Sequence, residues 1–317
     1  MSRPQFFIVG APKAGTSSMA SYLRQHPQLF LPDLKDVPFF GTDLSYLPAR
    51  PSSTEYLALF SVSQPEQLTG DACVSYLQSR RAAEEIKAYQ SNARIVIMLR
   101  DPVAAMHSMH SHLRYLHEED IEDFGEALEA EADRASGLRV PPGVRLVDAL
   151  LYRDVFAYHD QVQRFLECFG PDRVLILLFD DLKRDAAKVV RATYEFLHVD
   201  PSFVPDLSIE NPNKSVRLEW LQRLTMNPPP RFLRAFTRIA PRRLHGRVIP
   251  FLTHFNTKVS QRPPTEPTLD SMLRAEASPD IYRLSMLIDR DLSAWMAPGF
   301  REQDGEDLAQ TPAHRLK

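Results

Sequence analysis

Three short apolar runs interrupt the chain, at residues 6–9, Arg94–Leu99 and 174–179. None of them alternates between apolar and polar residues, so each predicts a strand buried on both faces of a parallel sheet. Amphipathic patterns typical of helices lie between and after these runs, the main ones at 17–26, 80–90, 103–116, 121–135, 146–169, 186–197 and 279–295. Strands that alternate with helices predict a three-layer α/β/α fold around a central parallel sheet.

Length and composition suit one globular domain. The chain has 317 residues, of which 44% are hydrophobic and 25% charged, as in ordinary soluble proteins. We expect a single domain over 1–300 and a disordered tail over 301–317. Residues 220–265 contain no Asp or Glu but many Arg. This segment is predicted to be a lid or insertion, a surface for an acidic acceptor, a peripheral contact with anionic lipid, or a solvated pair of helices.

Charge and cysteine content limit which partners and which cellular compartment the sequence suggests. A net charge of −3 gives no reason to expect nucleic acid as a partner. The two cysteines, Cys73 and Cys168, are too few for a disulfide framework, and no Cys/His spacing is typical of zinc. The apolar start is too short for a signal peptide, and no run could cross a bilayer. We therefore expect a cytoplasmic protein.

A glycine-bounded loop follows the first predicted strand. It reads Gly10-Ala-Pro-Lys-Ala-Gly-Thr-Ser-Ser18. A loop in this place directs backbone N–H groups and the positive end of a helix dipole at an anion. Its two glycines are spaced as in the nucleoside triphosphate loop G-x-x-x-x-G-K-[ST], but Thr16 stands where that loop has lysine. The lysine, Lys13, lies within the loop, which predicts a phosphate site different from that of a kinase or ATPase.

A second cationic position follows the second predicted strand. Arg100 opens Arg100-Asp-Pro102, and Ser108 lies in the helical pattern that comes next. Open α/β sheets bind ligands at the carboxyl ends of their strands, and a guanidinium can donate two hydrogen bonds to one phosphate. Taken alone, a strand followed by Arg-Asp-Pro is more often a solvated helix start. Together with the glycine-bounded loop it predicts a second anion site.

These two segments resemble signatures of sulfotransferases that use 3′-phosphoadenosine 5′-phosphosulfate (PAPS). The loop is similar to P-K-[SAG]-G-T-[ST]-[ST], and the second segment to R-[DN]-P-x(5)-S. The resemblance implies a P-loop NTPase-like sulfotransferase fold that uses PAPS as co-substrate and requires no metal. It implies that the 5′-phosphosulfate binds Lys13, Ala14, Gly15, Thr16, Ser17 and Ser18, and the 3′-phosphate Arg100, Ser108 and Arg262, the last from a nucleotide-covering loop.

Residues 31–40 resemble the K-E-x-x-F-F stretch of carbohydrate-type (heparan sulfate-like) and bacterial sulfotransferases. The resemblance implies that Asp36 is the base that deprotonates the acceptor, that Lys35 lies near the sulfuryl group, and that Lys13 stabilises the departing phosphate. Aspartate is one methylene shorter than the usual glutamate. A structural carboxylate paired with Lys35 is therefore an equally good interpretation of Asp36. Phe39 and Phe40 would form a wall of the site.

Residues 70–77 are similar to the G-E-x-S-P-x-Y segment of the same branch. By that resemblance Asp71, Ser75 and Tyr76 would line the acceptor cleft, although packing is at least as good an interpretation of Tyr76. Four histidines are weaker candidates for the base, and we expect most to be surface or packing residues: His107, His110, His112 and His117.

Two other classes of protein stay open. A P-loop kinase or ATPase is favoured only by Phe179-Asp-Asp181, which faintly resembles a magnesium-holding site. A nucleotide-binding relative without catalysis is the other alternative, since a fold alone does not prove chemistry. The acceptor, a small molecule, lipid or glycan with a hydroxyl or amine, is not specified, because variable loops form acceptor pockets.

Overall fold

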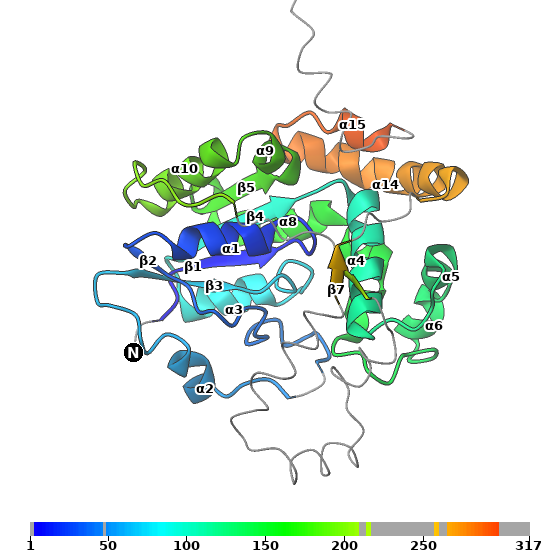
Figure 1. Ribbon diagram of the computed structural model, residues 1–317, viewed down its shortest axis with the longest axis horizontal. Coiled ribbons are helices and arrows are strands. Elements are labelled where there is room, and N and C mark those ends of the chain that lie inside the picture. Colours follow the sequence, from blue (N-terminus) through cyan, green and yellow to red (C-terminus); the bar gives the residue numbers. More distant parts are fainter. Residues whose placement is uncertain (1–2, 47–48, 209–213, 217–256, 260–264, 298–317) are drawn as a thin grey trace, which may run out of the picture.

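The computed structural model describes residues 3–46, 49–208, 214–216, 257–259 and 265–297. Five parallel strands form the central sheet in the order β2-β3-β1-β4-β5 (Figure 1). Their bounds are Phe6–Gly10 (β1), Leu29–Phe30 (β2), Leu68–Ala72 (β3), Arg94–Leu99 (β4) and Val174–Leu178 (β5). After β3 the chain crosses over β1 to form β4. The strand order therefore reverses at β1 and β4, the place where sheets of this kind bind ligands.

Helices cover both faces of this sheet. α1 and α10 pack together on one face and α3 and α8 on the other, while α4 and α14 pack at the side of the sheet (Figure 1). The helices of the first half are Thr16–Arg24 (α1), Ser53–Ala58 (α2), Ala82–Tyr89 (α3), Pro102–Leu116 (α4), Phe124–Glu129 (α5) and Glu131–Ala135 (α6). Those of the second half are Tyr152–Val155 (α7), Tyr158–Phe169 (α8), Phe179–Arg184 (α9), Ala186–Leu197 (α10), Pro267–Ile288 (α14) and Ser293–Met296 (α15).

Four smaller elements complete the described chain. Val147–Leu150 and Pro171–Arg173 are short 3-10 helices. Lys214–Val216 (β6) and Thr257–Val259 (β7) form an antiparallel pair, and β6 contacts α4. The two ends of the intervening sequence are thus brought together beside the helix that contains Ser108.

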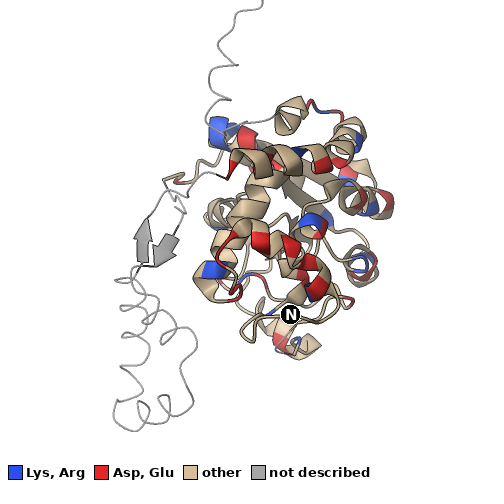
Figure 2. Cartoon of the chain, turned by 90° about the vertical axis from the view of Figure 1, so that its right-hand side faces the viewer, with Lys and Arg blue, Asp and Glu red and all other residues tan. Residues whose placement is uncertain are grey.

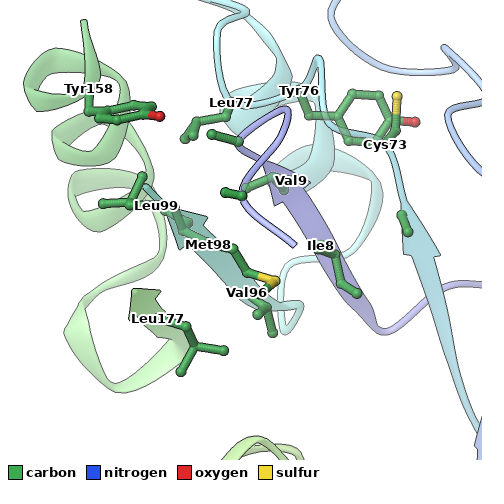
Figure 3. Close-up of a cluster of buried hydrophobic side chains, with 14 of the residues drawn as sticks. Ile8, Val9, Cys73, Tyr76, Leu77, Val96, Met98, Leu99, Tyr158 and Leu177 are labelled. Carbon is green, nitrogen blue, oxygen red and sulfur yellow. The ribbon is translucent and has the colours of Figure 1, made fainter. Parts of the chain in front are cut away.

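The core lies around β1 and β4. All five residues of β1 and the last five of β4 are buried. Figure 3 shows Ile8 and Val9 from β1 close to Val96 and Met98 from β4, with Tyr158 of α8 nearby. Fully burying one such aliphatic side chain contributes about 1.5–3 kcal/mol, so these strands hold the ends of both predicted anion-binding segments firmly.

The predicted three-layer α/β fold with a central parallel sheet is confirmed. β4 and α10 have the predicted bounds, β1 extends one residue further to Gly10, and β5 ends at Leu178 because Phe179 begins α9. The prediction of one helix over 146–169 is wrong. The backbone leaves helical geometry at Leu151 (ψ 73°) and Ala157 (ψ 85°), which divides the segment into a 3-10 turn, α7 and α8.

Two further expectations need correction, and one strand was not expected. The pattern over 121–135 forms two short helices, beginning only at Phe124 where Asp123 caps α5. The C-terminal helix does not begin at Pro279 but at Pro267, where Glu266 caps α14. Strand β3 was not predicted because its sequence, Leu-Thr-Gly-Asp-Ala, is not an apolar run. Its Gly70 is required, since an added Cβ would lie 2.1 Å from the ring of Phe6.

Charges are mixed on the face drawn in Figure 2. Acidic residues are prominent on its described helices, with basic residues interspersed among them. None of the helices that the structure describes is both long and apolar enough to cross a bilayer. Most of 220–265 and all of 301–317 lie outside the described residues.

Candidate active site

The glycine-bounded loop connects β1 to α1 at the carboxyl edge of the sheet. Gly15 precedes α1 with a φ of 84°, in the left-handed region, and no side chain caps the helix. An added Cβ there would lie 2.9 Å from the ring of Phe179. The backbone N of Ala11 donates to the carbonyl of Met98 in β4 at 2.6 Å. At the start of α1, the backbone N–H groups and the hydroxyls that follow Gly15 are therefore the donors, an arrangement that binds anions.

Arg100 contacts this loop directly. Its Nη1 donates to the carbonyl oxygen of Lys13 at 3.0 Å, although the two residues are 87 positions apart. Its guanidinium also lies 4.8 Å from the ring centroid of Phe179, in cation–π geometry. The structure thus brings the two predicted anion-binding segments into one site. Ser108 lies in α4 and is 3% exposed.

The backbone and side chain of Asp36 are both held in place. Its φ is 58°, its backbone N donates to Ala72 O at 2.8 Å, and its Oδ1 accepts from Val74 N at 3.1 Å. Lys35 Nζ lies 2.5 Å from Oδ2, while the carboxylate side chain stays 40% exposed. Asp36 is therefore both paired with Lys35, as the structural interpretation expected, and accessible, as a base must be.

Contacts of residues 73–77 place Asp36 beside the glycine-bounded loop. Cys73 N donates to Ile8 O at 3.0 Å and Leu77 N to Val9 O at 2.8 Å. The carbonyl of Val74 is 3.0 Å from where a Cβ on Gly10 would lie. Since Val74 also binds Asp36, the predicted base and the start of the loop share one neighbour.

Asp71 is buried next to this arrangement. Its Oδ2 lies 2.6 Å from the hydroxyl of Tyr56 and 3.0 Å from that of Tyr76, which is also 2.9 Å from Val37 O. Burial raises the pKa of Asp71 to about 6, and the tyrosine hydrogen bonds act against that rise. Tyr76 is fully buried, as the packing interpretation expected, and Asp71 is only 5% exposed.

Other side chains of these motifs also pack inward. Ser75 is 6% exposed and accepts a hydrogen bond from Tyr46. Phe39 stacks on Tyr56 with ring centroids 4.0 Å apart, and Phe40 is 4% exposed. The two phenylalanines thus belong to an aromatic cluster with Tyr56, and their role as a wall of the site stays a prediction.

The histidines near Arg100 have packing contacts. A ring nitrogen of His107 lies 2.9 Å from Thr265 Oγ1, and the ring stacks on Phe124. His110 is 5% exposed, its Nε2 lies 3.0 Å from Ile121 O, and burial lowers its pKa. Within the described residues no three His, Cys, Asp or Glu side chains are grouped to hold a metal ion. The absence of a metal requirement stays a prediction.

The two aspartates of the kinase alternative are bound to other elements. Trp295 Nε1 donates to Asp180 at 3.0 Å, and Arg290 pairs with Asp181 at 2.7 Å. They join α9 to the C-terminal helices. Arg262 lies outside the described residues. Sequence reasoning missed Phe179, whose ring contacts both Gly15 and Arg100, because no motif marks a packing residue of this kind.

The fold and the site define a P-loop-like α/β protein with an anion-binding loop after its first strand. The sequence profile of the sulfotransferase domain matches residues 3–226. A solved sulfotransferase from Alicyclobacillus acidocaldarius is 30% identical, with a TM-score of 0.70 over 94% of this chain and 100% of that one. The chain belongs to the sulfotransferase domain family, and the predicted transferase class is confirmed.

More distant curated relatives are longer proteins. Human carbohydrate sulfotransferase 15 is 24% identical over 249 residues, covering 62% of this chain and 44% of that protein. The mouse bifunctional heparan sulfate N-deacetylase/N-sulfotransferase 4 is 25% identical over 213 residues, covering 63% of this chain and 23% of that protein. The chain thus spans less than half the length of these relatives. The comparisons give no support to the kinase alternative.

Proposed function

We propose that this protein transfers a sulfuryl group from PAPS to a hydroxyl or amine by in-line displacement. The observation that carries the proposal is the hydrogen bond from Arg100 Nη1 to Lys13 O, because it joins the two PAPS signatures in one site. Membership of the sulfotransferase domain family supports the same chemistry.

The glycine-bounded loop holds the 5′ end of the nucleotide. Backbone N–H groups of Ala14 to Ser18 and the hydroxyls of Thr16, Ser17 and Ser18 donate to the 5′-phosphosulfate. The ammonium of Lys13 neutralises the charge that develops on the bridging phosphate oxygen as its bond to sulfur breaks. Preorganised charge of this kind contributes most when it is fixed before the reaction.

Arg100 and Ser108 select the nucleotide by its 3′-phosphate. The guanidinium is already held by Phe179 and the Lys13 carbonyl, so little side-chain entropy is lost when it binds. Arg262 completes this end of the site in our proposal. Adenosine 3′,5′-bisphosphate (PAP) is the product that these residues retain after transfer.

Asp36 acts on the acceptor. Its carboxylate accepts the proton of the acceptor hydroxyl, the freed oxygen forms a bond to sulfur, and the sulfur–oxygen bond to the 5′-phosphate breaks with its electron pair leaving on PAP. In the proposal, Lys35, whose Nζ is 2.5 Å from Asp36 Oδ2, turns its charge toward the sulfuryl oxygens. Two curated relatives are named as carbohydrate and heparan sulfate sulfotransferases, so a sugar hydroxyl or amine is the first acceptor class to test.

Calorimetric titration of PAP, AMP and ADP, followed by transfer from radiolabelled PAPS to pooled glycan, lipid and metabolite fractions, tests the proposal. We expect PAP to bind at least tenfold more tightly than AMP, since a charge-assisted hydrogen bond contributes about 1.5–3 kcal/mol. Lys13→Ala should abolish transfer and Arg100→Ala should mainly weaken PAP binding. Equal affinities for PAP and AMP, or magnesium-dependent ATP turnover, would contradict it. Tight PAP binding without transfer to any fraction would favour the inactive relative.

A further inference from the structure

The C-terminal helices reach the anion site through a buried ion pair. Arg274 in α14 is 2% exposed, and its Nη1 lies 3.0 Å from Asp101 Oδ2. Asp101 directly follows Arg100 and is fully buried. Its other oxygen, Oδ1, accepts from Val103 N at 2.9 Å and so caps α4, the helix that contains Ser108. One carboxylate therefore joins Arg274 to the segment that contains Arg100 and Ser108, two of the predicted ligands of the 3′-phosphate.

A second series of contacts connects Arg274 to Phe179, the residue whose ring packs against Arg100. Arg274 Nη1 donates to the carbonyl of Trp295 at 2.7 Å, and Trp295 Nε1 donates to Asp180 at 3.0 Å. Asp180 follows Phe179, whose ring lies 4.8 Å from the Arg100 guanidinium carbon. Figure 1 shows α14 and α15 beside α9 and near one end of α4, as both series of contacts require.

The charge of Arg274 also keeps Asp101 ionised. Burial raises the pKa of Asp101 to about 6, and Arg274 acts against that rise. Without Arg274 the buried carboxylate of Asp101 would lose the cation of this ion pair, and it would take up a proton instead. A neutral Asp101 is a weaker cap, because its attraction to the α4 dipole is lost. Arg100 and Ser108 would then be less firmly placed.

We infer that Arg274 is a positioning residue for the nucleotide, fixing Arg100 and the start of α4 so that the site discriminates in favour of a 3′-phosphate. This inference rests on the proposed function. It adds to the site a part of the chain, beyond residue 226, that the sulfotransferase domain profile does not match. Arg274 acts through Asp101 and Trp295 and needs no contact with the ligand.

The test is the ratio of the dissociation constants for AMP and PAP, measured calorimetrically on the full chain. Arg274→Met should lower this ratio about tenfold or more, because a small misplacement of a binding group is costly, while AMP affinity should change little. Arg274→Lys, which keeps the charge, should restore part of the ratio. Arg283→Gln is the matched control, since Arg283 also lies in α14 but is exposed, pairs with the exposed Asp160 and should leave the ratio unchanged.

Milder variants keep the test informative if Arg274→Met does not fold. Asp101→Asn retains a capping side chain but loses the ion pair, and Trp295→Phe retains the ring but loses the bond to Asp180. Both should lower the AMP/PAP ratio. Folded variants that keep the wild-type ratio would overturn the inference. A wild-type protein that binds PAP no better than AMP would instead contradict the proposed function, and the inference with it.

Discussion

The two carboxylate oxygens of Asp36 have different environments. Oδ1 is fixed by Val74 N at 3.1 Å, whereas Oδ2 faces Lys35 Nζ at 2.5 Å. A general base needs a lone pair that the acceptor can reach, and 40% exposure of the side chain provides it. Because Oδ1 is held by the backbone, we expect Oδ2 to take the proton once Lys35 turns to the sulfuryl group.

Asp36→Asn tests this assignment. The amide cannot accept the acceptor's proton, so we expect transfer to fall roughly 10²–10⁴-fold. PAP affinity should be unchanged, because Asp36 does not contact the nucleotide in our proposal. Asp36→Glu is the matched control and should retain transfer. Turnover of the Asn variant at the wild-type rate would assign the base to another residue.

The raised pKa of Asp71 predicts that the stability of the protein depends on pH. The single hydroxyl hydrogen of Tyr76 faces both Asp71 and Val37 O, and a proton on Asp71 would supply the missing donor. Its folded pKa of about 6 exceeds the ordinary 3.8, so its contribution to the free energy of unfolding is complete below 3.8 and is lost as pH rises through 6.

We expect that loss to be about 3 kcal/mol at most for a buried carboxyl with this shift. Urea unfolding of the wild type and of Asp71→Asn between pH 4 and 7 measures it, since asparagine has no proton to lose. The wild-type free energy of unfolding should fall relative to the variant as pH rises. Parallel curves would show that Asp71 stays ionised throughout.

Single residues were predictable where a motif fixes them. Lys13 and Arg100 were found by their spacing around strands, and the structure brings them together. The partners of Asp71 and the position of Phe179 under Arg100 were not predictable. Both depend on tertiary contacts, between residues 15 positions apart for Asp71 and Tyr56 and 79 apart for Arg100 and Phe179.

At the level of elements, the start of α1 depends on Gly15. Gly15→Ala would strain a φ of 84° and place a Cβ 2.9 Å from Phe179. We expect the free energy of unfolding to fall by about 1–3 kcal/mol and PAP binding to weaken, because Phe179 supports Arg100. Gly137→Ala is a matched control with a φ of 79° and open space around the added Cβ. Equal destabilisation in the two variants, by thermal melting, would assign no role to Phe179.

The sequence predicts a helix or strand correctly where a single hydrophobic pattern dominates its segment. Apolar runs identified β1, β4 and β5, but β3 carries Gly70 and Asp71, which serve packing and a buried hydrogen-bond cluster rather than a strand pattern. The pattern over 146–169 kept a helical period across two backbone breaks, which sequence does not show. The pattern over 279–295 predicts a helix start at Pro279, although this proline lies inside α14.

For the whole molecule, the C-terminal helices belong to the same core as the sheet. α14 packs on α8, and its Leu273, Ile281 and Leu284 are at most 1% exposed. Trp295 of α15 is 2% exposed. These contacts join α14 and α15 to the core of the sheet, although the family profile matches only residues 3–226. The single domain over 1–300 stays a prediction.

A chain shortened to residues 1–266 should therefore fail to fold. Four buried side chains of α14 and α15 contribute about 1.5–3 kcal/mol each, together of the order of the roughly 5–15 kcal/mol that stabilises a whole domain. Near-ultraviolet circular dichroism and thermal melting would show a chain without fixed tertiary structure. A chain shortened to 1–297 is the control and should melt like the full protein. If residues 1–266 instead melted cooperatively and kept the AMP/PAP ratio, the C-terminal helices would be an appendage, and Arg274 could not position Arg100.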